Sequence, residues 1–171
     1  MGTAEELVAV YDADGVEIGV ATRAQVRAEG LWHAATAVLV CPEDGQRVYV
    51  HLRSPHKDVY PAMHDCWAGG VLLSGESPSA CAERELAEEL GIRGVTLEPL
   101  FTLRYVDGTV RYHAHTFVTH WDGPVVHQPE EVVAGWWMDL TELRARLADP
   151  TWPFVPDGRL LFQEWERRRN G

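Results

Sequence analysis

Apolar and polar positions along the chain first separate strand-like from helix-like segments. Residues 7–10 and 16–21 flank the turn sequence Asp12-Ala13-Asp14-Gly15, and two such segments around a glycine-containing turn predict a hairpin. Thr22 then precedes a short polar helix that ends at Gly30. We therefore expect an N-terminal extension over residues 1–30, made of a hairpin and a helix.

The next segments predict strands of a mixed sheet. Residues 34–40 form an apolar run typical of a buried strand, and the Asp44-Gly45 turn predicts that it pairs with residues 48–52. A second hairpin is expected where residues 100–106 and 110–121 flank an Asp-Gly turn.

The C-terminal third predicts one more strand and two helices. Residues 133–138 are expected to be the strand, and Thr141 is expected to cap a helix through Leu147. A Pro-rich turn at residues 150–156 precedes the final helix. Its expected apolar face consists of Leu160, Leu161 and Trp165.

Residues 70–92 combine an apolar start, a glycine turn and a helix with clear end signals. Ser77 suits the N-cap, Pro78 the first turn and Gly91 the position after the last turn. The helix is therefore expected over residues 78–90. Its apolar stripe consists of Ala82, Leu86 and Leu90, which repeat every four residues.

Three carboxylates share one face of this helix. Glu85, Glu88 and Glu89 stand at i, i+3 and i+4, so their side chains emerge within one turn of each other. Only Arg84 offers a cation on a neighbouring turn. A bound divalent cation would relieve the repulsion, and Mg²⁺ or Mn²⁺ prefers carboxylate oxygens together with substrate phosphates.

The order of residues in this segment resembles the Nudix box of the Nudix hydrolase superfamily. The matching positions are Gly70, Glu76, Arg84, Glu85, Leu86, Glu88, Glu89, Gly91 and Ile92. Agreement at so many positions is far more specific than a lone glycine motif. The resemblance implies an α/β (α+β) fold, the Nudix α/β/α sandwich with a mixed sheet, in one domain over residues 1–171. It also implies an enzyme that hydrolyses a diphosphate linked to another group.

The resemblance further implies a metal site and a catalytic base. Glu85, Glu88, Glu89 and the carbonyl of Gly69 would hold one or more Mg²⁺ or Mn²⁺ ions. Water would be the nucleophile. Glu85, Glu89 or a loop acid such as Glu131 could deprotonate it, and the sequence does not rank them.

Four other residues would support this chemistry. Arg84 would fix the helix carboxylates, and Glu76 would support the metal site from the turn. Gly70 lacks a Cβ and would let the backbone approach a metal or phosphate. Gly91 would end the helix.

Two further segments carry candidate residues. Arg53 and Lys57 lie in the charged loop at residues 53–61, which is similar to a phosphate-holding loop of related Nudix proteins. Glu130 and Glu131 follow a long strand, in a region from which many Nudix enzymes recruit a carboxylate. Candidates for a pocket wall or for stacking are His113, His115, Trp67, Tyr112, Trp136 and Trp137.

Weaker motifs resemble the isopentenyl-diphosphate-isomerase-like branch of the superfamily. They include the N-terminal hairpin, the Leu31-Trp32-His33 segment and the loop at residues 53–61. The isomerase's catalytic cysteine and metal-binding histidine align with Ala68 and Gly70, so the isomerase chemistry lacks its key groups here. The chain looks like an isomerase relative with an intact hydrolase box.

Three functions follow from these patterns. The first is metal-dependent hydrolysis of nucleoside di- or triphosphates or of other nucleotide derivatives. The alternatives are isomerisation of an isoprenoid diphosphate and non-catalytic nucleotide sensing, since a fold alone does not fix a function.

Composition limits the partners. The formal charge is −11, with 15 basic and 26 acidic side chains, which argues against tight binding of a nucleic-acid polymer. The three cysteines form no disulfide or zinc pattern, which suits a reducing cytoplasm. We see neither a secretory leader nor an apolar run that could span a bilayer. We expect a cytoplasmic protein without a membrane partner, and the resemblance is compatible with a homodimer.

Overall fold

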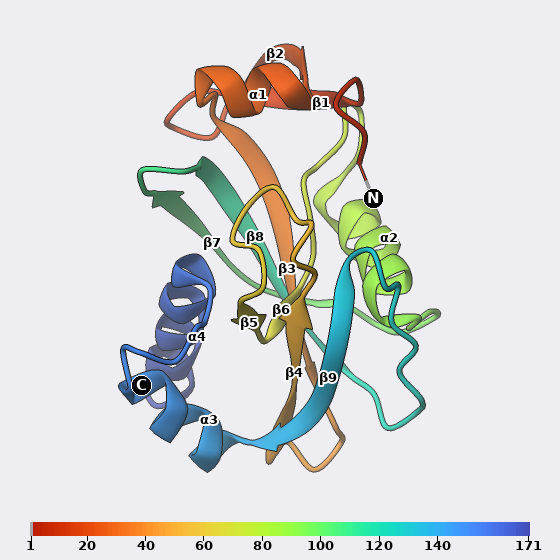
Figure 1. Cartoon of the computed structure of the whole chain (residues 1–171), viewed down its shortest axis with the longest axis vertical. Helices are drawn as coiled ribbons and strands as arrows, with labels where there is room; N and C mark the ends of the chain where they lie inside the picture. Colours follow the sequence, from red (N-terminus) through yellow and green to blue (C-terminus); the bar gives the residue numbers. More distant parts are fainter. Residues whose placement is uncertain (1) are drawn as a thin grey trace.

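The computed structural model describes residues 2–171, so Met1, the first residue of the expected single domain, lies outside the described residues. Its helices and strands follow the chain in the order shown in Figure 1. The strands are β1 (Leu7–Tyr11), β2 (Glu17–Thr22), β3 (His33–Cys41), β4 (Arg47–Arg53), β5 (His64–Asp65), β6 (Trp67–Ala68), β7 (Glu98–Val106), β8 (Arg111–His120) and β9 (Val132–Asp139). The helices are α1 (Arg23–Glu29), α2 (Pro78–Leu90), α3 (Leu140–Ala148) and α4 (Pro156–Arg169).

The strands form two central sheets and a separate ribbon. The four-stranded sheet has the order β6-β3-β8-β7, and the three-stranded sheet has the order β5-β4-β9. Strands β3 and β8 are parallel, whereas every other pairing is antiparallel. The strands lie between α2 on one flank and α3 and α4 on the other (Figure 1). This arrangement confirms the expected mixed α+β fold.

The N-terminal extension forms as the sequence indicates. Strands β1 and β2 pair as a hairpin, and Thr22 caps α1 with a reciprocal capping box to Gln25. Gly30 ends α1 in the left-handed conformation. The extension covers one end of the central sheets (Figure 1).

The expected pairing of the first two central strands is wrong. The turn around Gly45 forms, with a hydrogen bond from Gly45 N to Pro42 O, but it connects strands of different sheets. Strand β3 is buried along its length and pairs on one edge with β6 and on the other with β8. It has no free edge for β4, which pairs with β9 and β5 instead. A local turn signal fixes a reversal of the chain but not the partner of each strand.

Two details near the C-terminus also differ from expectation. Helix α3 begins at Leu140 with Asp139 at the N-cap, so Thr141 lies within its first turn. On α4, Leu161 and Trp165 are buried, but Leu160 is 40% exposed. Because α4 begins at Pro156, its buried face is completed by Phe162 rather than by Leu160.

Helix α2 matches its prediction at both ends. Ser77 Oγ accepts a hydrogen bond from Ala80 N at 3.2 Å, and Gly91 takes the left-handed conformation with φ of 67°. The predicted stripe of Ala82, Leu86 and Leu90 is fully buried against β3, β6 and β8, in a hydrophobic cluster with Phe117. This packing fixes the face of α2 that carries the carboxylates.

A second, larger hydrophobic cluster lies between the sheets and the C-terminal helices and includes Leu39, Val50, Leu143 and Leu161. The three cysteines are buried and free. No helix within residues 2–171 is long and apolar enough to cross a bilayer.

Candidate active site

The carboxylates of α2 lie where the helix meets the sheet. Glu85 and Glu89 are 8% and 2% exposed, whereas Glu88 is half-buried. Burial raises the pKa of Glu85, and it raises the pKa of Glu89 to about 8. Acids in such an environment bind a proton or a cation more readily than exposed acids do.

Arg84 connects the turn to the helix carboxylates. Its Nε and Nη2 donate to the two oxygens of Glu76 at 2.7 and 3.0 Å. Its Nη1 donates to Glu85 Oε1 at 2.6 Å and lies 3.6 Å from Glu88 Oε2. Partial burial favours the neutral acid, but the hydrogen bonds from Arg84 hold the pKa of Glu76 below its usual value. This geometry suits the expected role of Arg84 in fixing the carboxylates.

Lys57 brings a loop acid to the same carboxylates. Its ammonium group forms a close ion pair with Glu131 and lies 4.0 Å from Glu89 Oε1. Glu131 is 5% exposed, whereas its neighbour Glu130 points to solvent. Of the two loop acids that the sequence left open, the structure therefore places Glu131 beside α2.

Two glycines allow the backbone to pass close to these acids. Gly69 N donates to Glu89 Oε2 at 3.3 Å, and a Cβ on Gly69 would lie only 1.9 Å from Thr36 O. A Cβ on Gly70 would lie 2.5 Å from the Glu85 carboxylate. A side chain at either position would therefore disturb β3 or the carboxylate itself.

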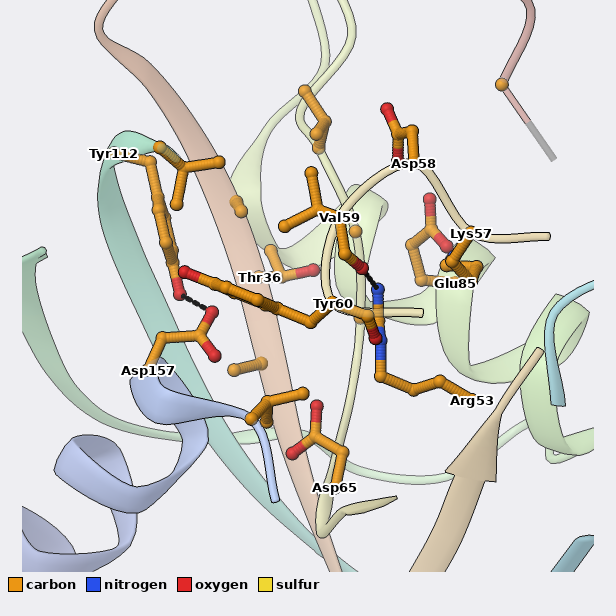
Figure 2. Close-up of a pocket in the computed structure, with 18 of the residues that line it drawn as sticks. Thr36, Arg53, Lys57, Asp58, Val59, Tyr60, Asp65, Glu85, Tyr112 and Asp157 are labelled. Atoms are coloured by element: carbon orange, nitrogen blue, oxygen red, sulfur yellow. Dashed lines mark hydrogen bonds between the residues drawn. The ribbon is translucent and has the colours of Figure 1, made fainter. Parts of the chain in front are cut away.

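These groups border a cavity of about 390 Å³, a size typical of small-molecule sites. Its walls come from β3, β8, the start of α4 and the loop between β4 and β5 (Figure 2). Glu85, Lys57, Glu131, Gly69 and Gly70 line it. These five expected residues thus meet at one cavity, whereas Glu76, Arg84, Glu88 and Glu89 are not among its lining residues.

Arg53 also lines the cavity, but its hydrogen bonds run to the loop. Its Nη2 donates to Val59 O at 2.7 Å and its Nε donates to Tyr60 O at 3.1 Å (Figure 2). Tyr60 in turn donates from its phenol to Asp107, in the turn between β7 and β8. Arg53 therefore holds the loop in place next to Lys57.

The donor set fits a hard divalent cation in its chemistry. Within residues 2–171, no three His, Cys, Asp or Glu side chains are already arranged as a metal cluster. The cationic groups of Arg84 and Lys57 instead balance the charge of Glu85 and Glu89. The absence of a Cβ at Gly70 leaves room for the Glu85 carboxylate, which lines the cavity. Carboxylate and carbonyl oxygens are the ligands that Mg²⁺ and Mn²⁺ prefer.

The other candidates divide between the cavity and the rest of the protein. Trp67 and Tyr112 line the cavity. His113 instead stacks on Trp32 and contacts the carbonyl of Asp12 through Nε2, which fixes the N-terminal hairpin. Two further candidates, His115 and Trp137, are not among the cavity-lining residues, and Trp136 stands 37% exposed on β9.

Sequence reasoning missed several residues of the cavity wall, among them Tyr60, Asp65 and Asp157. Tyr60 stands in the loop that was assigned to phosphate, and Asp157 follows the proline that begins α4. Asp65 follows the loop as part of a two-residue strand. Neither acid belongs to a sequence motif, so only their shared position in the fold shows that they belong to the cavity wall.

Comparisons with known proteins agree with this geometry. A model described as the NUDIX domain matches residues 31–158. The chain is 45% identical over 174 residues to an uncharacterised Nudix hydrolase, orf19, of Rhodococcus erythropolis, with 96% of this chain and 94% of the relative covered. It is 33% identical over 164 residues to the uncharacterised Nudix hydrolase YfcD of Escherichia coli K12, with 95% and 88% covered.

Solved structures show the same architecture. The crystal structure of DR0079 from Deinococcus radiodurans matches with a TM-score of 0.77 at 21% identity, covering 92% of this chain and 98% of that one. The MutT protein from Methanosarcina mazei matches with a TM-score of 0.68 at 20% identity, covering 82% and 96%. At such identities the likeness concerns the fold alone.

Proposed function

Because this chain belongs to the Nudix hydrolase family, we propose that it hydrolyses a diphosphate linkage in a nucleoside di- or triphosphate or another nucleotide derivative with Mg²⁺ or Mn²⁺. Members of this family act on nucleoside diphosphate derivatives and generally use divalent metal ions. The observation that carries the proposal is the position of two buried acids next to Lys57: Glu85 lines the cavity, and Glu89 Oε1 lies 4.0 Å from the Lys57 ammonium group. Buried acids at the edge of a cavity are costly for the fold and are typical of functional sites.

The metal ligands in this proposal are Glu85, Glu88, Glu89 and the carbonyl of Gly69. A bound Mg²⁺ or Mn²⁺ ion would polarise the diphosphate and neutralise charge on the leaving group. Arg84 keeps Glu85 and Glu88 in one orientation through its hydrogen bond and ion pair. Glu76 anchors Arg84 and accepts a hydrogen bond from Leu73 N, so the turn and the helix are held as one unit.

The proposed base that deprotonates the attacking water is one of three acids. Glu89 and Glu131 both approach Lys57, and Glu85 borders the cavity directly. A base must reach the water within hydrogen-bonding distance and must be ionised. Lys57 favours the ionised form of Glu89 against the effect of burial.

The substrate phosphates are proposed to lie between α2 and the loop of Lys57. An ammonium group is a strong partner for phosphate oxygens. Arg53 contributes by holding the carbonyls of Val59 and Tyr60, so that the loop keeps Lys57 against the cavity. We assign Arg53 mainly to positioning.

The test measures phosphate or nucleotide release from nucleoside di- and triphosphates, sugar-nucleotide diphosphates and isopentenyl diphosphate, each with Mg²⁺, Mn²⁺ or EDTA. Glu88→Gln and Glu89→Gln should each lower kcat by about 10²-fold or more, as removal of an essential electrostatic group does. Glu83→Gln is the matched control, because Glu83 is exposed on the same helix. Unchanged turnover in both variants would remove the metal-ligand assignment, and silence across the panel would remove the proposed activity.

A further inference from the structure

The cavity contains a second pair of acids, away from the carboxylates of α2. Asp65 comes from β5 and Asp157 from the first turn of α4, and both point into the cavity (Figure 2). Asp65 is 8% exposed and Asp157 is half-buried. Neither residue belongs to the Nudix box.

Among the residues that the structure describes, these acids have no arginine or lysine in ion-pair contact, although the charge of Arg53 acts on both of them against the effect of burial on their pKa. Asp65 Oδ1 accepts a hydrogen bond from Trp67 N at 3.0 Å, and Asp157 accepts one from the Tyr112 phenol at 2.7 Å and one from Gly158 N. These donors are all neutral. Within residues 2–171, neither acid forms an ion pair with an arginine or lysine, and no side chain donates a hydrogen bond to Asp65.

Such an arrangement is unfavourable in an empty protein. Burial, followed by the charge of Asp157, raises the pKa of Asp65 to about 7, and burial also raises the pKa of Asp157. A buried acid without a cationic partner destabilises a fold. A ligand that brings hydrogen-bond donors would relieve this cost.

The cavity is electrically polarised as a result. Lys57 stands next to Glu85 of α2, whereas Asp157 stands at the start of α4, with Asp65 and Arg53 between them in this view (Figure 2). The walls next to the two acids include Val110, Val155 and Leu161. A phosphate is favoured near Lys57 and disfavoured between the two acids.

The remaining end of the cavity offers no comparable unmet charge. It is lined by Arg23 and Arg27, but these side chains already pair with Glu6 at 2.8 Å and with Asp58 at 2.9 Å. Within residues 2–171, the cavity-lining acids without an ion pair to arginine or lysine are therefore Asp65 and Asp157.

We propose that Asp65, Asp157 and Tyr112 form the subsite that recognises the group beyond the diphosphate, and that this group presents amino N–H donors. This inference rests on the proposed function. The substrate class is a nucleotide whose base carries an amino group, because ionised carboxylates accept hydrogen bonds from amino groups and repel carbonyl oxygens, and such donors favour the ionised form of Asp65 over its protonated form. A purely hydrocarbon group or a second phosphate would leave the acids unsatisfied.

The experiment compares matched substrates that differ in one amino group. The first pair is cytidine triphosphate and uridine triphosphate, and the second is guanosine triphosphate and inosine triphosphate. The wild-type ratio of kcat/KM should favour the amino-bearing member by about tenfold or more in at least one pair, since an unpaired buried acceptor is strongly disfavoured.

Variants locate the preference. Asp65→Asn and Asp157→Asn should each bring the ratio in that pair close to one, while turnover of the amino-lacking member persists. Asp14→Asn is the control, because Asp14 is an exposed acid in the β1–β2 turn. A ratio that both variants leave at the wild-type value overturns the subsite assignment.

The outcomes separate the two proposals. Hydrolysis of nucleotides with wild-type ratios near one in both pairs overturns the subsite inference and leaves the proposed hydrolysis intact. Hydrolysis of isopentenyl diphosphate without hydrolysis of any nucleotide overturns both proposals. No metal-dependent hydrolysis of any compound overturns the proposed function itself. If an aspartate variant fails to fold, two measurements still test the subsite. They are the wild-type ratios and the ratios in Tyr112→Phe, which keeps both acids.

Discussion

Replacing Gly70 by alanine provides a direct test of the carboxylate geometry. The new Cβ would lie 2.5 Å from both Cδ and Oε1 of Glu85, and such contacts essentially never fall below 3.0 Å. The carboxylate must therefore retreat by at least about 0.5 Å. It cannot retreat freely, because Arg84 Nη1 donates to Oε1 at 2.6 Å and is itself held by Glu76.

The expected loss is mainly in catalysis. A displacement approaching 1 Å in a catalytic group can lower turnover by about 10²-fold, which is the change that we expect in kcat with Mg²⁺. The free energy of unfolding should fall by only about 1 kcal/mol, since the clashing atoms belong to a side chain and not to the backbone. Steady-state kinetics and urea denaturation measure the two effects separately.

A glycine in open space provides the control. Gly19 lies in the exposed strand β2, and an added Cβ there meets no heavy atom within 4 Å, so Gly19→Ala should keep both kcat and stability. Wild-type kcat in Gly70→Ala would refute the requirement for Glu85 in its present position. A loss of several kcal/mol in stability would show that the substitution damages the fold instead.

Three further predictions concern stability. Gly69→Ala should lower the free energy of unfolding by about 2 kcal/mol or more in urea titrations, because its Cβ would stand 1.9 Å from the backbone oxygen of Thr36. An unfolding free energy equal to that of the wild type would contradict this close packing of Gly69 against β3. Lys57→Met should cost about 3 kcal/mol by leaving Glu89 and Glu131 without their shared cation, whereas Lys57→Arg should keep most of the stability. The pKa of Asp65 is raised to about 7 in the folded protein, so Asp65 keeps a proton there that the unfolded chain releases above about pH 4. The stability that this group contributes therefore falls as the pH rises from about 4 to 7. The melting temperature of Asp65→Asn minus that of the wild type should therefore be larger at pH 8 than at pH 5. An equal difference at both pH values would exclude the raised pKa of Asp65.

The parts of the fold that sequence predicts well are those that depend on near neighbours. The hydrogen bond between Ser77 and Ala80 spans three residues, and Gly91 ends α2 through its own backbone conformation. The box acids also lie within one turn of α2. Local geometry therefore fixes both this helix and the face on which its carboxylates emerge.

The parts that sequence misses depend on distant partners. The contact between Lys57 and Glu131 joins residues 74 positions apart, and sequence alone could not choose between Glu130 and Glu131. The pairing of β3 with β8 instead of β4 is decided by which edges are buried in the assembled sheets. Asp65 and Asp157 carry no local signal, since an aspartate near a turn or at a helix start is also a common structural residue.

The parallel pairing of β3 with β8 has a consequence for the order in which the protein is made. Residues 33–41 pair in register with residues 112–120, so the box emerges from the ribosome before the strand that completes its sheet. Helix α2 has its own caps and can form early, but a growing chain of about one hundred residues lacks both Tyr112 and Asp157. The binding cavity is therefore a late product of synthesis. A nascent chain released before α4 carries the carboxylates that we propose as metal ligands without a complete cavity wall.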